Sequence, residues 1–440
     1  MSIELMNTMN GRTCSCGKVH SFNTEICIEK GTIQKLPFYI RKFDAKKAFV
    51  LSDKNTYEAA GKQVCNILDD QNISFTDYHF AHFPVEPDEY SVGATIMHYD
   101  PQCDIIVGVG SGVVNDIGKI VSMVSGKPYI IVATAPSMDG YASASSSMTR
   151  NGLKLSLATR SADVIIGDTD ILCQAPLHMM KSGLGDMLAK YVSICEWRIA
   201  QIVASEYYCE EIAQLIRGAL KRCIDNAQGL LSRDPEAVQA VFEGLVIGGV
   251  AMNYAGLSRP ASGVEHYISH VMDMRGVEFG TPVELHGVQC AIGTLLAVRL
   301  YEKIKDTTPC AEKALKYAKE FDYSAWAETL RAFLGKGAES MTALEQKEKK
   351  YDVDAHKKRL QIILDNWDSI LKIITEELPL STEIESVLEM IDAPKSLESI
   401  GIDEKDFPTI FKCTKDIRDK YVLSRLAWDL GILDELATDA

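Results

Sequence analysis

The stretch Ile105–Lys119, IIVGVGSGVVNDIGK, decides the fold of this 440-residue chain. It begins as an apolar run, turns through Gly108, Gly110 and Gly112, and continues with a helical pattern. Glycines let the backbone turn sharply and approach a ligand, and the N–H groups at the start of the following helix attract an anion such as a pyrophosphate. The spacing GxGxG departs from the usual dinucleotide motif GxGxxG, so a purely structural strand-to-helix turn stays open as an alternative.

Apolar runs on both sides of this stretch predict one parallel sheet. The expected strands are short and bounded by Gly, Pro or Asp: Lys47–Ser52, Phe75–Phe80, Ile105–Gly110, Tyr129–Ala133 and Val164–Gly167. Two segments with helical spacing, Tyr57–Asn72 and Asp88–Tyr99, lie between them. Continuous apolar strands separated by helix-length segments are typical of a parallel sheet that helices cover on both faces.

The pattern changes after about residue 175, where the strand patterns stop and long helical patterns begin. The expected helices are Lys181–Ser205, Tyr207–Ser232, Pro235–Gly256, Val283–Ile304, Tyr323–Phe333 and Asp354–Leu378. We therefore expect an α/β domain over residues 1–175 that binds a dinucleotide, and an all-helical domain over residues 176–440 that binds metal and substrate. The cleft between two such domains is the default ligand site.

Composition restricts the partners of the chain. Its 61 acidic residues exceed its 46 Lys and Arg residues, which gives a formal net charge of −15. A strongly negative surface disfavours nucleic acid and anionic membranes, because clustered cations bind both. No apolar run approaches the roughly 18 residues of a membrane span, and the N-terminus has no signal-peptide core. We expect a soluble, cytoplasmic protein that works on small molecules.

The twelve cysteines are scattered through predicted helices and strands, as reduced, buried thiols of a cytosolic protein would be. Cys14, Cys16 and His20 form a cluster near the N-terminus. Two thiols and an imidazole could hold a metal ion, but these are only three soft ligands and their spacing is not that of a zinc finger. Both interpretations stay open.

A second polar loop follows the strand after the glycine-rich turn. It runs from Thr134 to Ser143 with the sequence TAPSMDGYAS, dense in hydroxyls and glycine. The carboxyl ends of adjacent parallel strands are where open α/β sheets bind ligands. Asp53 ends the first strand, where it could bind an adenosine ribose or simply cap the next helix.

Histidine spacing predicts a metal site. His266 and His270 lie four residues apart, so on a helix both imidazoles share one face. His286 follows at an apparent helix start, and Asp186, in GLGD, at the apparent start of another. A carboxylate with two imidazoles is the ligand set of a catalytic divalent ion that keeps positions open for substrate. Structural histidines, and an Asp186 that only caps its helix, are the alternatives.

Together these motifs resemble those of the sn-glycerol-1-phosphate dehydrogenases, in the superfamily of iron-type alcohol dehydrogenases, glycerol dehydrogenases and dehydroquinate synthases. The resemblance rests on GSGVVND, TAPSMDGYASASSSM, SGLGD, SRPASGVEHYISH and LHGVQ, which occur in this order between about residues 14 and 300. The form GSGVVND and the early CSCG element are similar to the bacterial branch. The resemblance implies a dehydroquinate synthase-like fold, with a Rossmann-like parallel-sheet domain before an all-helical one.

The resemblance also implies roles for individual residues. The pyrophosphate of NAD(H), or alternatively NADP(H), would lie on the glycine-rich turn: Gly110, Gly112, Val113, Val114, Asn115 and Asp116. The nicotinamide side would be lined by Thr134, Ser137 and Ser143. One divalent ion, zinc, nickel or iron, would be ligated by Asp186, His266 and His286. The substrate would be contacted by Asp139, Asp186, His270 and Lys154, and we add Arg259 as a phosphate contact because of its forked donors.

The implied reaction is a reversible, NAD(P)H-linked reduction of dihydroxyacetone phosphate to sn-glycerol 1-phosphate in phospholipid metabolism. The metal would polarise the ketone and His270 would supply the proton, with Asp139 and Lys154 orienting the substrate. Asp53 would repel a 2′-phosphate and favour NADH. A homodimer is expected by resemblance. A polyol dehydrogenase acting on unphosphorylated substrate, a dehydroquinate synthase-like cyclase and a non-catalytic nucleotide-binding scaffold remain alternatives.

Overall fold

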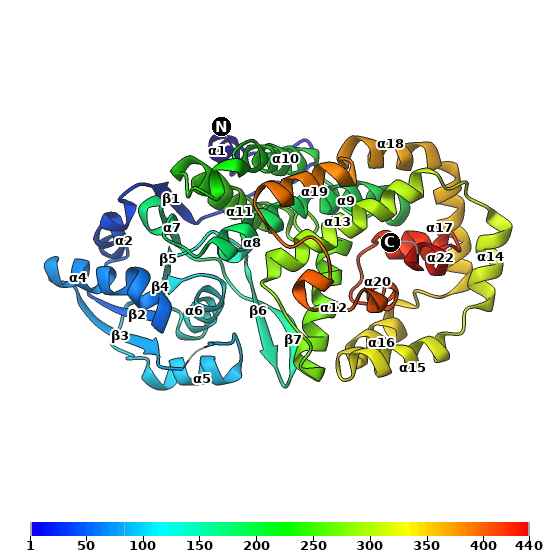
Figure 1. The fold of residues 1–440 in the computed structure, drawn as a ribbon. Coiled ribbons are helices and arrows are strands. Elements are labelled where there is room, and N and C mark those ends of the chain that lie inside the picture. The colour runs from blue at the N-terminus through cyan, green and yellow to red at the C-terminus, as the bar shows by residue number, and fades with distance from the viewer. Residues whose placement is uncertain (1, 83, 439–440) are drawn as a thin grey trace. The chain divides into compact units, whose positions relative to one another are not determined.

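A computed structural model describes residues 2–82 and 84–438 of the chain (Figure 1). The chain forms two compact units, and each consists of two separate stretches of sequence. The first unit comprises Met1–Met187 and Gln214–Leu257, and the second comprises Leu188–Ala213 and Ser258–Ala440. The sequence predicts one division near residue 175, whereas here the chain crosses from one unit to the other three times.

The first unit is built on a six-stranded parallel sheet with the order β1-β8-β5-β4-β2-β3. Its strands are β1 (Glu25–Glu29), β2 (Lys47–Asp53), β3 (Ser74–Phe80), β4 (Ile105–Gly110), β5 (Tyr129–Ala133) and β8 (Val164–Asp168). Every residue of β4 and β5 is buried, as their continuous apolar sequences predict. The parallel sheet is thereby confirmed. The sequence did not reveal β1, an edge strand whose residues are only half-buried.

The first unit also contains helices before, between and after these strands. They are α1 (Ser2–Met9), α2 (Leu36–Lys42), α3 (Lys54–Thr56), α4 (Lys62–Asp70), α5 (Glu89–His98), α6 (Gly112–Ser125), α7 (Thr169–Leu172), α8 (Leu177–Leu188), α10 (Glu210–Asp225) and α11 (Pro235–Ala255). A hairpin of β6 (Ser145–Arg150) and β7 (Leu153–Ala158) projects from the sheet (Figure 1). Its turn, Asn151-Gly152, has φ angles of 52° and 73°. An Asn-Gly pair favours such a turn, so this dipeptide could have predicted the hairpin.

Two glycines of the deciding stretch make room for one ring. A Cβ added at Gly108 would lie 2.4 Å from the Tyr129 hydroxyl, and one added at Gly118 would lie 2.5 Å from the same atom. Tyr129 itself is fully buried. Gly108 therefore has a structural role in the packing of β4, β5 and α6.

One helix, α11, is long and apolar enough to cross a membrane by length and composition alone. However, 83% of its most apolar window is buried inside the protein. Burial of this kind is typical of a core helix. Its apolar side chains pack within the first unit.

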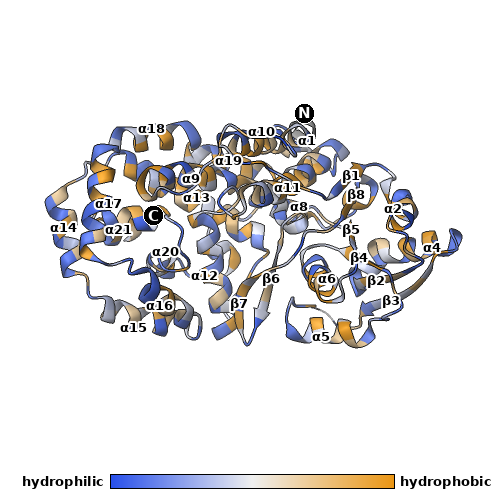
Figure 2. Ribbon diagram, turned by 180° about the vertical axis from the view of Figure 1, so that it is seen from behind, coloured by the Kyte–Doolittle hydropathy of each residue, from blue (hydrophilic) through white to orange (hydrophobic). Residues whose placement is uncertain are grey.

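The second unit is helical. It contains α9 (Lys190–Ala204), α12 (Val264–Phe279), α13 (His286–Lys305), α14 (Ala311–Glu320), α15 (Tyr323–Leu334), α16 (Gly337–Glu348), α17 (Val353–Asp365), α18 (Trp367–Glu377), α19 (Ser381–Met390), α20 (Phe407–Thr414), α21 (Leu423–Asp429) and α22 (Leu433–Thr438). Hydrophobic and hydrophilic residues alternate along helices such as α18, because each buries one face (Figure 2). Buried side chains from most of these helices form one continuous core.

Three sequence predictions about helices need correction. Asp186 does not open a helix, because α8 begins at Leu177 and Asp186 lies in its last turn. The predicted helix Lys181–Ser205 is in fact divided into α8 and α9, and Asp354–Leu378 is divided at Asn366 into α17 and α18. The helix carrying the histidine pair and the helix start at His286 are confirmed.

Candidate functional site

The glycine-rich turn leads directly from β4 into α6. A Cβ added at Gly110 would lie 2.6 Å from the Cβ of Val114, so only glycine lets the strand end this close to the helix. Gly112 and Val113 begin α6, where the N–H groups of the first turn have no intrahelical acceptor. These N–H groups and the positive end of the helix dipole fit the pyrophosphate of a dinucleotide.

A buried lysine ties this helix to the second polar loop. The Lys119 ammonium donates to the carbonyl of Gly140 (3.2 Å), to the Ser143 hydroxyl (3.3 Å) and to the carbonyl of Ser145. It also forms an ion pair with Asp116 at 2.9 Å. Burial nevertheless raises the pKa of Asp116. Sequence analysis missed Lys119, although it lies at the i+3 position from Asp116.

The remaining loop residues also lie close to α6. The Thr134 N–H donates to the carbonyl of Gly110 (3.1 Å), and the Asn115 amide donates to the carbonyl of Gly140 (3.1 Å). Thr134, Ser137, Asp139 and Ser143 are all buried. The structure therefore brings the predicted cofactor residues of both loops together at the carboxyl end of the sheet.

Asp139 and Asp186 meet within the first unit. The backbone N–H of Asp139 donates to Oδ2 of Asp186 at 2.9 Å, and the Asp186 carboxylate is completely buried. On the same helix, the Ser182 hydroxyl donates to the carbonyl of Ser137. The loop that carries the predicted substrate contact is thus fixed to the helix that carries the predicted metal ligand.

Asp53 caps a helix. Its Oδ1 accepts hydrogen bonds from the N–H groups of Asn55 (2.8 Å) and Thr56 (2.9 Å) at the start of α3. Asp53 is therefore a helix cap, which is one of the two roles that the sequence left open. A ribose contact would have to use the carboxylate that already caps α3. Lys154 lies on β7, where its charge acts to lower the pKa of Asp116.

Three histidines gather on two helices of the second unit. His266 and His270 lie on α12, and His286 is the first residue of α13. The ring centroids of His266 and His286 are 5.0 Å apart, and those of His270 and His286 are 6.3 Å apart. His266 is buried, whereas His270 and His286 are half-buried. The helical spacing read from the sequence therefore does place three imidazoles together.

A buried glutamate orients the first of these histidines. The Nδ1–H of His266 donates to Oε1 of Glu265 at 2.8 Å, and the same oxygen accepts from the N–H of Gly263. A carboxylate on Nδ1 directs the Nε2 lone pair toward a metal and raises its basicity. Glu265 immediately precedes His266 in the sequence, but nothing in the spacing indicated this role.

A second buried carboxyl group, that of Glu196, lies near Glu265. Glu196 accepts hydrogen bonds from the N–H groups of Val264 (2.9 Å) and Leu423 (2.7 Å). Burial, together with the nearby charge of Glu265, raises the pKa of Glu196 to about 8. The rise in the pKa of Glu196 comes first from burial and then from the charge of Glu265, so the pKa reports how close the two carboxyl groups lie.

Cys290 joins the histidines. Its Sγ lies 3.6 Å from Nε2 of His286, and the ligand atoms of His266, His286 and Cys290 all lie within 4.8 Å of one another. Burial alone would raise the pKa of Cys290, but the two imidazoles outweigh it and lower the pKa. His286 and Cys290 have the same i, i+4 spacing as the histidine pair, so the sequence carried a pattern that could have found this thiol. The donor set fits a divalent transition-metal ion.

Arg259 lies in the loop before α12 and is already engaged. Its guanidinium donates to Glu206 (2.6 Å from Nε) and to the carbonyl of Tyr421 (2.9 Å). Its charge is therefore balanced by Glu206 within the fold. The sequence predicted only a phosphate contact for Arg259 and not this ion pair.

Two further cations accompany it. Burial, together with Arg259 and Arg418, lowers the pKa of Lys420 to about 7. The Lys420 ammonium donates to the carbonyl of Ser262 (2.8 Å) and lies 5.7 Å from the ring centroid of Tyr267 on α12. Burial is the larger cause of this shift, but the nearby positive charges of Arg259 and Arg418 contribute to it, and a group of neighbouring cations favours a bound anion.

Comparison with known proteins agrees with the fold. A model of the iron-containing alcohol dehydrogenase family matches residues 27–176. The solved structure of glycerol dehydrogenase from Schizosaccharomyces pombe matches 96% of this chain and 92% of that chain with a TM-score of 0.59, at 17% identity. The chain thus has the fold of this solved structure, and a segment of its first unit is similar to the iron-containing alcohol dehydrogenase family.

Two relatives show the family to which the chain belongs. The glycerol-1-phosphate dehydrogenase, NAD(P)+, of Halalkalibacterium halodurans is 30% identical over 294 residues, which cover 66% of this chain and 74% of that protein. The protein of the same name from Bacillus licheniformis is 30% identical over 332 residues, which cover 73% and 83%. The chain belongs to the glycerol-1-phosphate dehydrogenase family. The expected pair of cofactors, NAD(P)H and a divalent metal ion, is confirmed for this family.

Proposed function

We propose that this protein reduces dihydroxyacetone phosphate to sn-glycerol 1-phosphate with NAD(P)H, reversibly and with one divalent metal ion. The observation that carries the proposal is that the first turn of α12 carries an oriented histidine and also lies near positively charged side chains. His266 is oriented there by Glu265, and the adjacent Tyr267 lies beside the Lys420 ammonium. An oxidoreductase that acts on a phosphorylated ketone needs a metal-binding histidine to activate the ketone and cations to bind the phosphate.

The metal is held, in this proposal, by Asp186, His266 and His286, with Cys290 beside the two histidines. When bound, the metal supplies Lewis-acid polarisation of the ketone and the nicotinamide supplies the hydride. Zinc, nickel and iron all suit imidazole and carboxylate ligands, and the thiol of Cys290 favours the softer ions.

His270 supplies the proton to the substrate oxygen. Its half-buried imidazole stacks at 23° on that of His286, so it lies next to the metal ligands without being needed as one. An imidazole changes charge near neutral pH, which suits reversible proton transfer.

The phosphate of the substrate binds Lys420 and Arg418, with Arg259 holding the loop before α12 in place. A phosphate dianion near these cations raises the pKa of Lys420 again and so stabilises its charged form. Asp139 and Lys154 orient the triose, as the resemblance implies. The phosphate is what separates this proposal from a dehydrogenase of unphosphorylated polyols.

The dinucleotide lies on the turn of Gly110–Asp116, with its nicotinamide toward Thr134, Ser137 and Ser143. Asp53 remains the proposed ribose contact, and its negative charge disfavours a 2′-phosphate, so NADH is the preferred form. We also propose that the protein is a cytoplasmic homodimer.

The test is NADH oxidation by metal-supplemented protein, with dihydroxyacetone phosphate beside dihydroxyacetone. Turnover that requires the phosphate ester supports the proposal. Equal turnover of both ketones would identify a polyol dehydrogenase, and no turnover by metal-loaded protein would favour the cyclase.

Two variants then separate the roles of the histidine pair. His266→Ala should lose metal and activity together, because two remaining protein ligands hold a divalent ion poorly. His270→Ala should keep the metal but slow turnover. Metal loss in His270→Ala with retention in His266→Ala would mean that the two roles are exchanged.

A further inference from the structure

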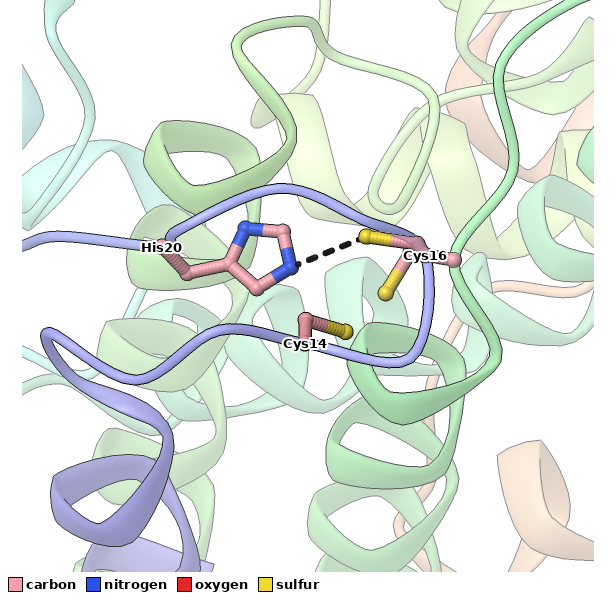
Figure 3. Close-up of side chains that lie close together, drawn as sticks. Cys14, Cys16 and His20 are labelled. Carbon is pink, nitrogen blue, oxygen red and sulfur yellow. Dashed lines mark hydrogen bonds between the residues drawn. The ribbon is translucent and has the colours of Figure 1, made fainter.

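A tight turn near the N-terminus brings together three metal-binding side chains that the proposed reaction does not use. Ligand atoms of Cys14, Cys16 and His20 all lie within 4.8 Å of one another. Figure 3 shows the two thiols and the imidazole facing one another across the turn. Cys14 and His20 are buried, with exposed fractions of 5% and 1%, and Cys16 is half-buried.

The backbone fixes this arrangement. The N–H of Cys14 donates to the carbonyl of Lys18 (2.8 Å), and Thr13 pairs with Val19 in an antiparallel bridge. Gly17 closes the turn with a φ of 82°, which only glycine adopts readily. The cluster is therefore held by main-chain hydrogen bonds rather than by the chance proximity of three mobile side chains.

His20 is held in the tautomer that binds metals. Its Nδ1 lies 2.9 Å from the carbonyl oxygen of Tyr254 in α11, and a carbonyl can only accept, so Nδ1 carries the proton. Nε2 is then the lone-pair nitrogen, and it points at Sγ of Cys16, 3.5 Å away. A backbone carbonyl on the distal nitrogen is the usual companion of a metal-ligating histidine.

Ring packing and a hydrogen bond hold the segment around the cluster in place. The His20 and Tyr254 rings lie 5.5 Å apart, and the Tyr254 hydroxyl donates to the carbonyl of Met6 at 3.0 Å. Phe22 packs edge-on against the same ring. These contacts join the N-terminal segment to α11, the core helix of the first unit.

We propose that Cys14, Cys16 and His20 bind a structural zinc ion, distinct from the catalytic metal. Binding deprotonates the two thiols, releases their protons to solvent, and places two thiolates and one neutral imidazole on the ion. Tetrahedral zinc then takes one further ligand. The ion fastens the N-terminal turn onto α11, so its removal loosens this segment without touching a residue of the proposed active site.

Metal content distinguishes this ion from the catalytic one. Protein purified with zinc and passed over a desalting column should hold two equivalents per chain. His266→Ala, which removes a proposed catalytic ligand, should hold one, and Cys16→Ser should also hold one. Cys310→Ser is the matched control, because Cys310 is an exposed thiol outside both clusters, and it should hold two.

Further readouts separate a bound ion from a folding defect. Cys16 is half-buried, so Cys16→Ser should fold even where His20→Ala does not. In cobalt-substituted protein, a thiolate-to-cobalt charge-transfer band should persist in the double variant His266→Ala/Cys290→Ser and disappear when Cys16→Ser is added. Cys16→Ser should also lower Tm while KM for the ketone stays unchanged.

The outcomes are decisive for each site separately. Wild-type protein with one equivalent that Cys16→Ser retains and His266→Ala loses would overturn the structural zinc and leave the proposed function intact. One equivalent that His266→Ala retains and Cys16→Ser loses would support the structural zinc and contradict the catalytic ligand set.

Discussion

Replacing Gly263 by alanine should disable the metal site without changing a ligand. The φ of Gly263 is −125°, outside the left-handed region, and the main expected effect of the substitution is a steric clash at the new Cβ. The new Cβ would lie 2.5 Å from Oε2 of Glu196 and 2.7 Å from Oε2 of Glu265. Ordinary contact begins near 3.4 Å, so the two carboxyl groups would have to retreat by about 0.9 and 0.7 Å.

Moving these two carboxyl groups is costly because each already forms hydrogen bonds. Glu265 holds Nδ1 of His266, and Glu196 holds the N–H of Val264 at the start of α12. Overpacking of a filled interior costs about 1–3 kcal/mol of stability. Loss of the carboxylate that orients a histidine ligand typically lowers metal affinity about 10- to 100-fold.

The assay is a metal titration of the apo protein, followed by NADH oxidation at saturating metal. Gly263→Ala should bind the ion at least about 10-fold more weakly and should recover part of its activity at high metal concentration. Gly218→Ala is the control, since a Cβ at that exposed helical glycine meets nothing within 4 Å. Wild-type metal affinity in Gly263→Ala would refute the argument that Glu265 orients His266.

Three further substitutions test the other assignments. Lys119→Met should destabilise the protein by about 2 kcal/mol in urea unfolding, because it leaves the half-buried Asp116 without its cation, and the double variant with Asp116→Asn should recover part of that loss. Full stability of the single variant would contradict this. Cys290→Ser should lower retained zinc more than retained manganese, since a thiolate prefers the softer ion, and equal retention would remove Cys290 from the site. Lys420, whose folded-state pKa is about 7, is charged only below that pH. KM for the phosphorylated ketone should therefore rise between about pH 6 and pH 8, and Lys420→Met should raise KM about 10-fold and remove this dependence, whereas an unchanged pH profile would place the phosphate elsewhere.

The sheet could be predicted from sequence because its strands are buried on both faces. Ile105–Gly110 and Tyr129–Ala133 were predicted with their observed ends, since a fully apolar run has no other stable location. The edge strand β1 could not be found in this way, because four of its residues are half-buried, Glu29 is exposed, and no long apolar run marks the strand. Periodicity also failed at Asn366, where two helices follow each other without a break in the apolar pattern.

The candidate site was predictable only where spacing along one element carries the information. His266 and His270 follow from helical geometry, and the same rule applied to His286 would have added Cys290. Lys420 lies 158 residues from its acceptor, the carbonyl of Ser262, and no local pattern connects two positions so far apart. Long-range electrostatic neighbours of this kind emerge only from the fold.

The role of Gly263 shows why the carboxylates behind a metal site escape local prediction. The motif SRPASGVEH reads as a turn before a helix, and its glycine looks like an ordinary helix start. In the fold, the missing Cβ is the space into which Glu196 and Glu265 both extend. Glu196 lies on α9, and its pKa is raised by burial and by the charge of Glu265. The glycine thus acts on His266 indirectly. It leaves room for the carboxyl groups of Glu196 and Glu265, and Glu265 in turn orients the imidazole.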